Sequence, residues 1–385
     1  MNGHTIDHAM VVFHPAPHSY TGQDLAEIGC HGNPIIVTKI MEAIRSTRLA
    51  RLAGKGEFTK RAFLNGKMDL AQAEAVGALI NAKNPLGIDM ASSLLQGSLS
   101  TRIKKICDNI LDIISTIEAS FIVDDEDTSK EDILAMIQPL INDMEDLLKD
   151  KGISPVLYDG IHTTIAGMPN AGKSSLFNAI LGYERAIVHE EKGTTRDIII
   201  ERITHQGIDF IFHDTAGIRE TPSGPEKIGV EKTIDTLKQS DLVLYVVDAL
   251  SGLQPEEAKW LSLGKKSILV INKIDLADGI RHDIPGISTV NVSAKYAQGM
   301  ADLFKTMEES YHCAEPKVFI DRHVFLIEQA LSSLIASRES IDAGMTDDVL
   351  TIDLNKAVES LMELLGDKPD QKILERIFSR FCVGK

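Results

Sequence analysis

The chain has 385 residues, 43% hydrophobic and 25% charged, and its formal net charge is −16. Such a composition is typical of a globular protein, and the length predicts two or three domains with their own cores. No apolar stretch reaches membrane-spanning length and residues 1–19 hold no signal-peptide core, so we expect no membrane partner. The acidic charge excludes general nucleic-acid binding, and any RNA contact must use a local basic patch or a partner's surface.

The cysteines are scattered along the chain without CxxC spacing. This spacing argues against a disulfide framework or a zinc site and favours a reducing, cytoplasmic location. They are Cys30, Cys107, Cys313 and Cys382.

Residues 1–68 have the pattern of a partial α/β domain. Ala9–Phe13 is rich in strand-forming residues, and Ile35–Ile44 has helical spacing. Lys55–Arg61 is predicted to be a loop that enters the next segment. The block is short for an independent domain, which predicts that an N-terminal part is missing.

Residues 69–157 are predicted to be helical. Apolar residues recur at steps of three and four, as expected for the core-facing stripe of a helix bundle. An acidic turn is expected at Asp124–Asp127, and a further helix at Ile133–Leu148. The stripe comprises Leu95, Leu99, Ile103, Ile106, Ile110, Ile113, Ile117 and Phe121.

Residues 158–312 alternate between strand and helix patterns, which predicts a mainly parallel sheet with helices on both faces. Helices are expected near 226–239, 255–264 and 300–311. Residues 313–385 return to helical spacing, so the economical architecture is an α/β domain inserted into one all-α domain. The predicted strands are Ile161–Ala166, Ile198–Thr204, Ile208–His213, Leu242–Val247, Ile268–Ile271 and Val290–Val292.

A phosphate-binding motif lies at the start of the inserted domain. Gly167–Ser174 reads G-x-x-x-x-G-K-S, between the Ile161–Ala166 strand and a helix that ends at Gly182. This P-loop arrangement turns backbone N–H groups toward a phosphate at a helix N-terminus. Lys173 is predicted to reach the β- and γ-phosphates, and the Ser174 hydroxyl to bind Mg²⁺.

Two further motifs are predicted to contact the phosphates. Asp214-Thr215-Ala216-Gly217 follows a strand, where Asp214 would hold the Mg²⁺ shell through water and the Gly217 N–H would contact the γ-phosphate. Gly193–Asp197 lies at the position of switch I, and Thr195 would be the second Mg²⁺ ligand from the protein.

Two motifs after later strands are predicted to bind the base. Asp275, in Asn272-Lys273-Ile274-Asp275, can accept hydrogen bonds from N1 and N2 of guanine, a pair that adenine does not offer. The Lys273 stem would cover the purine, and the Ala294 N–H, in Ser293-Ala294-Lys295, would meet guanine O6. The four motifs together predict a guanine-nucleotide site.

The residue after Gly217 is Ile218, where Ras-like enzymes have a glutamine that orients water. Hydrolysis therefore needs another device. The Asn170 side chain, with carbonyls of two residues in 189–191, could hold a monovalent cation near the β/γ bridge. Glu226 could orient the water through a second water, or be an ordinary surface carboxylate at a helix start.

The motifs G-x-P-N-A-G-K-S, G-T-T-R-D and D-T-A-G-I-R-E resemble those of TrmE–Era-like GTPases. The helical flanks, Gly56–Lys67 and the terminal Cys382-Val383-Gly384-Lys385 resemble, over essentially the full chain, the MnmE (TrmE) family of tRNA modification GTPases. The resemblance implies a cytoplasmic, K⁺-stimulated GTPase that forms a homodimer and a heterotetramer with the flavoprotein MnmG. It also implies that tRNA is modified at uridine-34 with a carboxymethylaminomethyl-type group, using 5,10-methylene- or 5-formyl-tetrahydrofolate.

Site residues follow by matching motif. The resemblance implies that Glu226 orients water, that Ser174 and Thr195 bind Mg²⁺, and that Cys382 has a role in modification or is a small buried apolar residue. The K⁺ ligands would be Asn170, His189, Glu191 and Thr194, and the folate contacts Glu27, Lys67 and Lys385. The GTP-binding set would be Asn170, Ala171, Gly172, Lys173, Ser174, Ser175, His189, Glu190, Glu191, Lys192, Gly193, Thr194, Thr195, Asp214, Thr215, Ala216, Gly217, Asn272, Lys273, Asp275, Ser293, Ala294 and Lys295.

The sequence departs from the family at three places. The family has about fifty further N-terminal residues, which places folate binding and N-terminal dimerisation in question. His189 replaces a small polar residue, and Phe121–Asp127 is looser than the acidic signature of the family. Two other readings stay open: an Era-like ribosome assembly factor, which would need a KH-type module, and a GTP switch without modifying activity.

Overall fold

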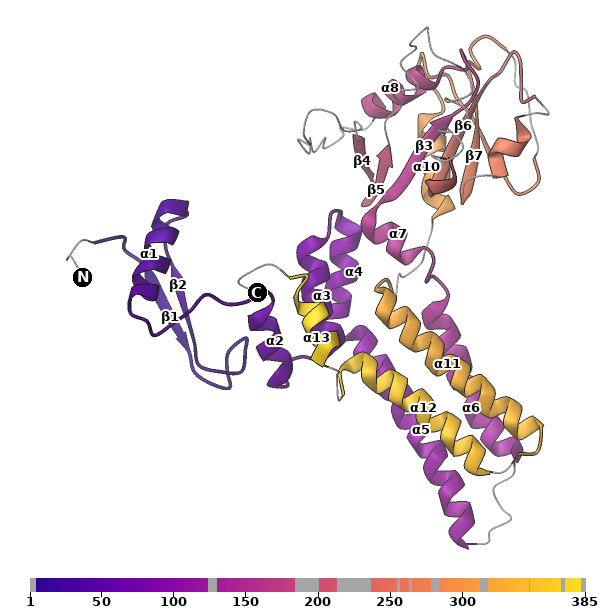
Figure 1. Ribbon diagram of the computed structural model, residues 1–385. Helices are drawn as coiled ribbons and strands as arrows, with labels where there is room; N and C mark the ends of the chain where they lie inside the picture. Colours follow the sequence, from indigo (N-terminus) through magenta and orange to yellow (C-terminus); the bar gives the residue numbers. More distant parts are fainter. Residues whose placement is uncertain are drawn as a thin grey trace. The chain divides into compact units, whose positions relative to one another are not determined.

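The chain was analysed as a computed structural model. It forms two compact units: the first comprises residues 1–81, 91–149 and 320–385, and the second comprises 82–90 and 150–319 (Figure 1). The described residues are 5–123, 130–183, 201–212, 237–254, 257–262, 265–277, 284–311, 318–345, 347–367 and 371–381. None of the helices in these ranges is long and apolar enough to span a membrane.

The second unit is built on a six-stranded sheet in the order β4-β5-β3-β6-β7-β8. All neighbouring strands pair in parallel except β4 and β5, which are antiparallel. The mainly parallel sheet predicted from the sequence is therefore confirmed. The strands are β3 (Ile161–Ala166), β4 (Glu201–His205), β5 (Ile208–Phe212), β6 (Leu242–Asp248), β7 (Lys266–Asn272) and β8 (Ser288–Asn291).

Helices flank this sheet. They are α7 (Ser154–Asp159), α8 (Lys173–Tyr183) and α10 (Met300–Ser310). The α-helix predicted at 255–264 is wrong for the described residues, because Ala258–Ser262 forms a short 3₁₀ helix, η1. Its turn begins where the Trp260 N–H donates to the Glu257 carbonyl, and three-residue spacing of this kind is the hydrogen-bond pattern of a 3₁₀ helix.

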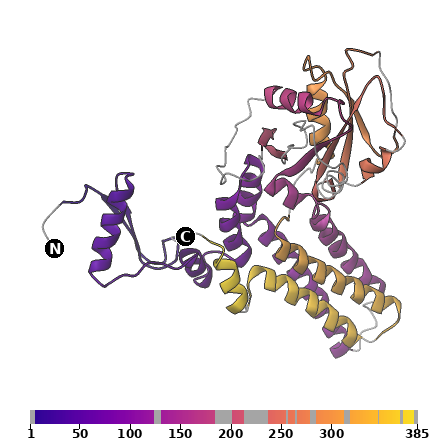
Figure 2. The same cartoon turned by 45° about the horizontal axis from the view of Figure 1, so that its top comes forward.

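The first unit is mainly helical. Figures 1 and 2 both show α11 (Asp321–Asp342) and α12 (Asp347–Leu365) running beside α5 (Ser98–Val123) and α6 (Lys130–Leu148). The predicted apolar stripe lies in the core, because its members from Leu99 to Ile117 are almost fully buried. The chain therefore builds one helical core from segments on both sides of the inserted sheet.

The two ends of this unit meet at α3 (Leu70–Asn81). Side chains of Leu70, Ala73 and Val76 pack against the last helix, α13 (Gln371–Phe378), and against Phe381 beyond it. α4 (Pro85–Leu95) follows α3 along the chain.

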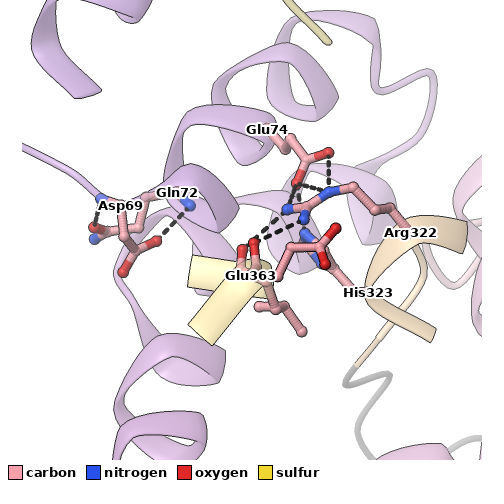
Figure 3. Close-up of polar contacts among 7 residues, drawn as sticks. Asp69, Gln72, Glu74, Arg322, His323 and Glu363 are labelled. Atoms are coloured by element: carbon pink, nitrogen blue, oxygen red, sulfur yellow. Dashed lines mark hydrogen bonds and ion pairs between the residues drawn. The ribbon is translucent and has the colours of Figure 1, made fainter. Parts of the chain in front are cut away.

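A buried polar cluster also ties α3 to the returning chain (Figure 3). Arg322 donates to both carboxylate oxygens of Glu74 at 2.6–3.2 Å, and His323 Nε2 lies 2.7 Å from Glu74 Oε2. The same guanidinium donates to the Glu363 and Leu364 carbonyls at the end of α12. Arg322 thereby satisfies helix C-terminal carbonyls while its charge is paired.

The N-terminal block holds the antiparallel strands β1 (Met10–His14) and β2 (Leu25–Gly29), followed by α1 (Pro34–Ser46). The loop predicted at Lys55–Arg61 is wrong from Glu57 onward, because α2 (Glu57–Leu64) begins there. Gly56 precedes the helix with φ +62°, and Glu57 pairs with Arg61 one turn later at 2.6 Å. An acidic residue in a first turn and an i,i+4 ion pair both favour helix.

Candidate functional site

The loop after β3 is built around two glycines that no other residue could replace without a shift. Gly167 has φ +139°, and a Cβ there would lie 2.1 Å from the Val246 carbonyl oxygen. Gly172 has φ +95°, and a Cβ there would lie 2.1 Å from Asn272 Nδ2. Only glycine combines these backbone angles with such close neighbours. The loop is thus pressed against β6 on one side and against the end of β7 on the other.

The loop leads directly into the N-terminus of α8, which begins at Lys173. Lys173 Nζ donates to the Met168 carbonyl of the same loop at 2.9 Å, so its ammonium lies over the turn. Ser174 and Ser175 are exposed in the first turn. A helix N-terminus after a glycine turn presents backbone N–H groups and a partial positive charge to an anion. The geometry therefore fits a phosphate group.

Asn272 joins three predicted motifs at one point. It is 1% exposed at the end of β7, and its Nδ2 donates to the Ala171 carbonyl of the loop at 3.0 Å. Its Oδ1 accepts a hydrogen bond from the Ala294 N–H at 3.0 Å. The Ala294 N–H that we predict to meet guanine O6 is therefore engaged by Asn272 here, so a bound purine would have to share or replace that bond.

Lys273 is held in the left-handed region, at φ +65°. Its Nζ donates to the Asn170 carbonyl and lies against Asp248 Oδ2, both at 2.7 Å. The Lys273 hydrogen bond holds the pKa of the Asp248 carboxyl below its usual value. Two fixed oxygens thus set the direction of the Lys273 stem, which is predicted to cover the base.

Asp248 was missed by sequence reasoning. It is the last residue of β6, and in the parallel pairing of β6 with β7 it lies opposite Asn272. A carboxylate at the end of a buried strand, level with the base motif, is the signal that could have identified it.

The predicted base-reading carboxylate is exposed but oriented. Asp275 Oδ1 accepts a hydrogen bond from Ser293 Oγ at 2.6 Å, and Ser293 is fully buried. Lys295 is exposed, with its Nζ 4.9 Å from the ring centroid of Tyr296. The structure therefore brings together the predicted residues of three motifs, 170–175, 272–275 and 293–295.

The remaining predicted site residues divide into two groups. Glu27 is exposed on β2, and Lys67 Nζ donates to the Pro17 carbonyl at 3.1 Å after α2. These two folate positions stay predictions. Outside the described residues lie His189, Glu190, Glu191, Lys192, Gly193, Thr194, Thr195, Asp214, Thr215, Ala216, Gly217, Glu226, Cys382 and Lys385, together with the acidic turn Asp124–Asp127 and part of the helix predicted at 226–239.

Comparison with known proteins covers the whole chain. Residues 70–382 match the family model described as the MnmE helical domain, and residues 1–67 match the model described as the GTP-binding protein TrmE N-terminus. A solved structure, the G domain of the T. maritima FeoB iron transporter, matches 40% of this chain and 99% of that chain at 28% identity. Its TM-score of 0.30 is too low to support an argument.

Three relatives carry the name tRNA modification GTPase MnmE. The protein of Carboxydothermus hydrogenoformans is 41% identical, covering 100% of this chain and 87% of the relative. Those of Finegoldia magna and Aquifex aeolicus are 39% and 38% identical, covering 99% and 100% of this chain and 87% and 88% of the relatives. The chain therefore belongs to the MnmE family of tRNA modification GTPases.

Proposed function

We propose that this chain binds and hydrolyses GTP in the course of tRNA modification. The observation that carries the proposal is the Asn272 side chain, which bonds both the phosphate loop and the segment after β8. This arrangement supports one site with a phosphate end and a base end. The match to relatives named tRNA modification GTPase along the whole chain favours this function over an Era-like assembly factor.

In the proposed site each residue has a stated part. Lys173 balances the charge that develops between the β- and γ-phosphates, and Ser174 with Thr195 holds Mg²⁺, whose charge stabilises the same oxygens. Asp214 orients the metal's water, and the Gly217 N–H contacts the γ-phosphate. Exposed Ser174 at the first turn of α8 fits a hydroxyl ligand facing the phosphates.

Selectivity for guanine is assigned to Asp275. Its carboxylate accepts two hydrogen bonds from guanine, and the Ser293 hydroxyl fixes its orientation from the buried side. A base that lacks these donors would leave the carboxylate unpaired, which is the stronger form of discrimination.

For hydrolysis we propose a K⁺ site formed by Asn170, His189, Glu191 and Thr194, between paired G domains of a homodimer, with Glu226 orienting the water. The resemblance of the P-loop and switch motifs supports this assignment. Asn170 lies at the exposed tip of the loop with φ +65°, so its side chain is free of the core and open to a ligand or a second copy.

The modification proposed is that of uridine-34 with a carboxymethylaminomethyl-type group. It would be carried out in the cytoplasm with the flavoprotein MnmG, in a heterotetramer. Glu27, Lys67 and Lys385 would contact the tetrahydrofolate that donates one carbon, and Cys382 would act in the modification. Motif resemblance is the support for these assignments.

The test of the nucleotide site is a binding comparison of GDP, ADP and XDP. We expect wild-type protein to bind GDP at least a hundredfold more tightly than ADP. Asp275→Asn should lose tenfold or more in GDP affinity and gain affinity for XDP, because an amide can donate to the second xanthine carbonyl. Asp302→Asn, at an exposed position on α10, is the matched control. Unchanged GDP affinity in Asp275→Asn would contradict the assignment.

The K⁺ site is tested by GTP turnover in KCl and NaCl at equal ionic strength. We expect a large preference for K⁺ that disappears in Glu226→Ala. Equal turnover in the two salts would remove Asn170 from a cation site and leave a K⁺-independent GTPase.

A further inference from the structure

One segment of this acidic chain has the opposite charge. Residues 45–67, here called the basic segment, contain seven Arg and Lys residues and one Glu, a net charge of +6. Since the whole chain carries −16, all other residues together carry −22. The cations are Arg45, Arg48, Arg51, Lys55, Lys60, Arg61 and Lys67.

Most of this charge faces solvent. Arg45, Arg48 and Lys55 are exposed, and in the part of the chain that the structure describes no carboxylate lies within ion-pair distance of them. Cations left without acidic neighbours retain their attraction for a mobile polyanion.

The single acid of the basic segment does not neutralise it. Glu57 accepts hydrogen bonds from Arg51 at 2.7 and 2.8 Å, from Arg61 at 2.6 Å and from the Gly54 N–H at 2.7 Å. The bond from Arg51, followed by those from Gly54 and Arg61, holds the pKa of this carboxyl far below its usual value. Glu57 therefore stays charged and fixes two arginines in place, and the cluster of three keeps a net positive charge.

We propose that the basic segment binds the phosphate backbone of the tRNA substrate. The proposal rests on the proposed function, because that function requires an RNA to approach a chain that is otherwise strongly negative. Guanidinium groups match phosphate oxygens in a fork geometry, and positive charge supplies most of the affinity for nucleic acid. A protein partner is less favoured than RNA, since this segment also contains Lys67, a predicted folate contact, and the modified uridine has to reach the one-carbon donor.

The test measures binding of fluorescently labelled tRNA to the full chain by anisotropy between 50 and 200 mM KCl. We expect Arg48→Glu combined with Lys55→Glu to weaken binding at least tenfold. Its plot of log affinity against log salt should be flatter by about 1.5, because each lost phosphate contact removes about 0.7–0.9 from the slope. Arg48→Gln combined with Lys55→Gln should show the same flattening with a smaller loss.

The matched control is Lys105→Glu, an exposed cation on α5 outside the basic segment. It changes the net charge in the same direction and should leave tRNA affinity within twofold. An equal loss in Lys105→Glu, or unchanged affinity in the double variant, would overturn the proposal.

GTP turnover of the double variant separates this proposal from the proposed function. Neither residue lies in the nucleotide site, so turnover and the thermal unfolding midpoint should equal those of wild type. A double variant that hydrolyses GTP normally and binds tRNA normally overturns the RNA surface alone. Wild-type protein that binds tRNA through the basic segment without hydrolysing GTP overturns the proposed function alone.

Discussion

Lys273 shows how one side chain of the nucleotide site is held before any ligand arrives. Its left-handed backbone carries strain, and its Nζ has two oxygen partners at 2.7 Å, the Asn170 carbonyl and the Asp248 carboxylate. The stem between backbone and Nζ is therefore stretched along a fixed path. A purine that packs on this stem would not have to pay for ordering it.

Removing the Asp248 charge should weaken nucleotide binding without abolishing it. For Asp248→Asn we expect about fivefold lower GDP affinity, or ~1 kcal/mol, since the ion pair is partly exposed and the Asn170 carbonyl still holds Lys273. Titration with a fluorescent GDP analogue measures this. Asp353→Asn removes a comparable surface ion pair with Lys356, outside the nucleotide site, and should have no effect. Equal affinities for all three proteins would rule out this role of Asp248.

At the scale of the element, the β3–loop–α8 unit depends on backbone space. Gly167→Ala should prevent normal folding of the second unit or reduce its free energy of unfolding by ~3 kcal/mol or more, because the methyl group would overlap the Val246 carbonyl. GDP binding should be lost with it. Thermal unfolding and GDP titration are the measurements.

Gly182→Ala is the control for that substitution. Nothing lies within 4 Å of a Cβ at this position of α8, and alanine favours helix over glycine by ~0.5–1 kcal/mol. We therefore expect unchanged or slightly higher stability and normal GDP binding. A Gly167→Ala protein as stable as Gly182→Ala would contradict the steric argument.

The elements that the sequence predicted share a physical cause. β6 and β7 are continuous apolar runs because parallel strands are buried on both faces, and α5 shows its core stripe as helical spacing. β2 was not predicted, because its residues Leu25–Gly29 are largely exposed and show no alternation. α2 was predicted as a loop because Gly56 obscured a helix whose start depends on ion pairs of Glu57.

The candidate site was predictable where short motifs carry it, and less so where folding brings distant groups together. Asn272, Asp275 and the glycines of the P-loop have positions that motif spacing indicates. Asp248 contacts Lys273 only because two strands pair in register. Periodicity and local motifs contain no information on such a pairing.

For the whole molecule, the Glu74 cluster is the polar link between the segments before and after the inserted sheet. Burial alone would raise the pKa of the Glu74 carboxyl, but the charge and hydrogen bond of His323, with Arg322, lower it to about 2 from 4.5. Because the folded pKa is the lower one, the contribution to stability is complete above pH 4.5 and is lost as pH falls toward 2.

Glu74→Gln should therefore destabilise the helical unit by ~3 kcal/mol near neutral pH, and the difference from wild type should shrink between pH 4.5 and 2. Unfolding midpoints from calorimetry across this range provide the measurement. Glu359→Gln, on the exposed face of α12, should track wild type throughout. A difference that is independent of pH would show that packing, and not the charge of Glu74, is responsible.

The construction of one helical core from both flanks has a consequence during synthesis on the ribosome. α5 and α6 emerge early, but α11 and α12, which cover their apolar faces, follow only after residues 150–319 have been made. At translation rates of ~5–20 residues per second, that interval lasts roughly ten to thirty seconds. For this time the nascent chain presents the Leu99–Ile117 stripe without its final partners, so the order of translation makes the helical unit the last part to complete and a natural client for chaperones.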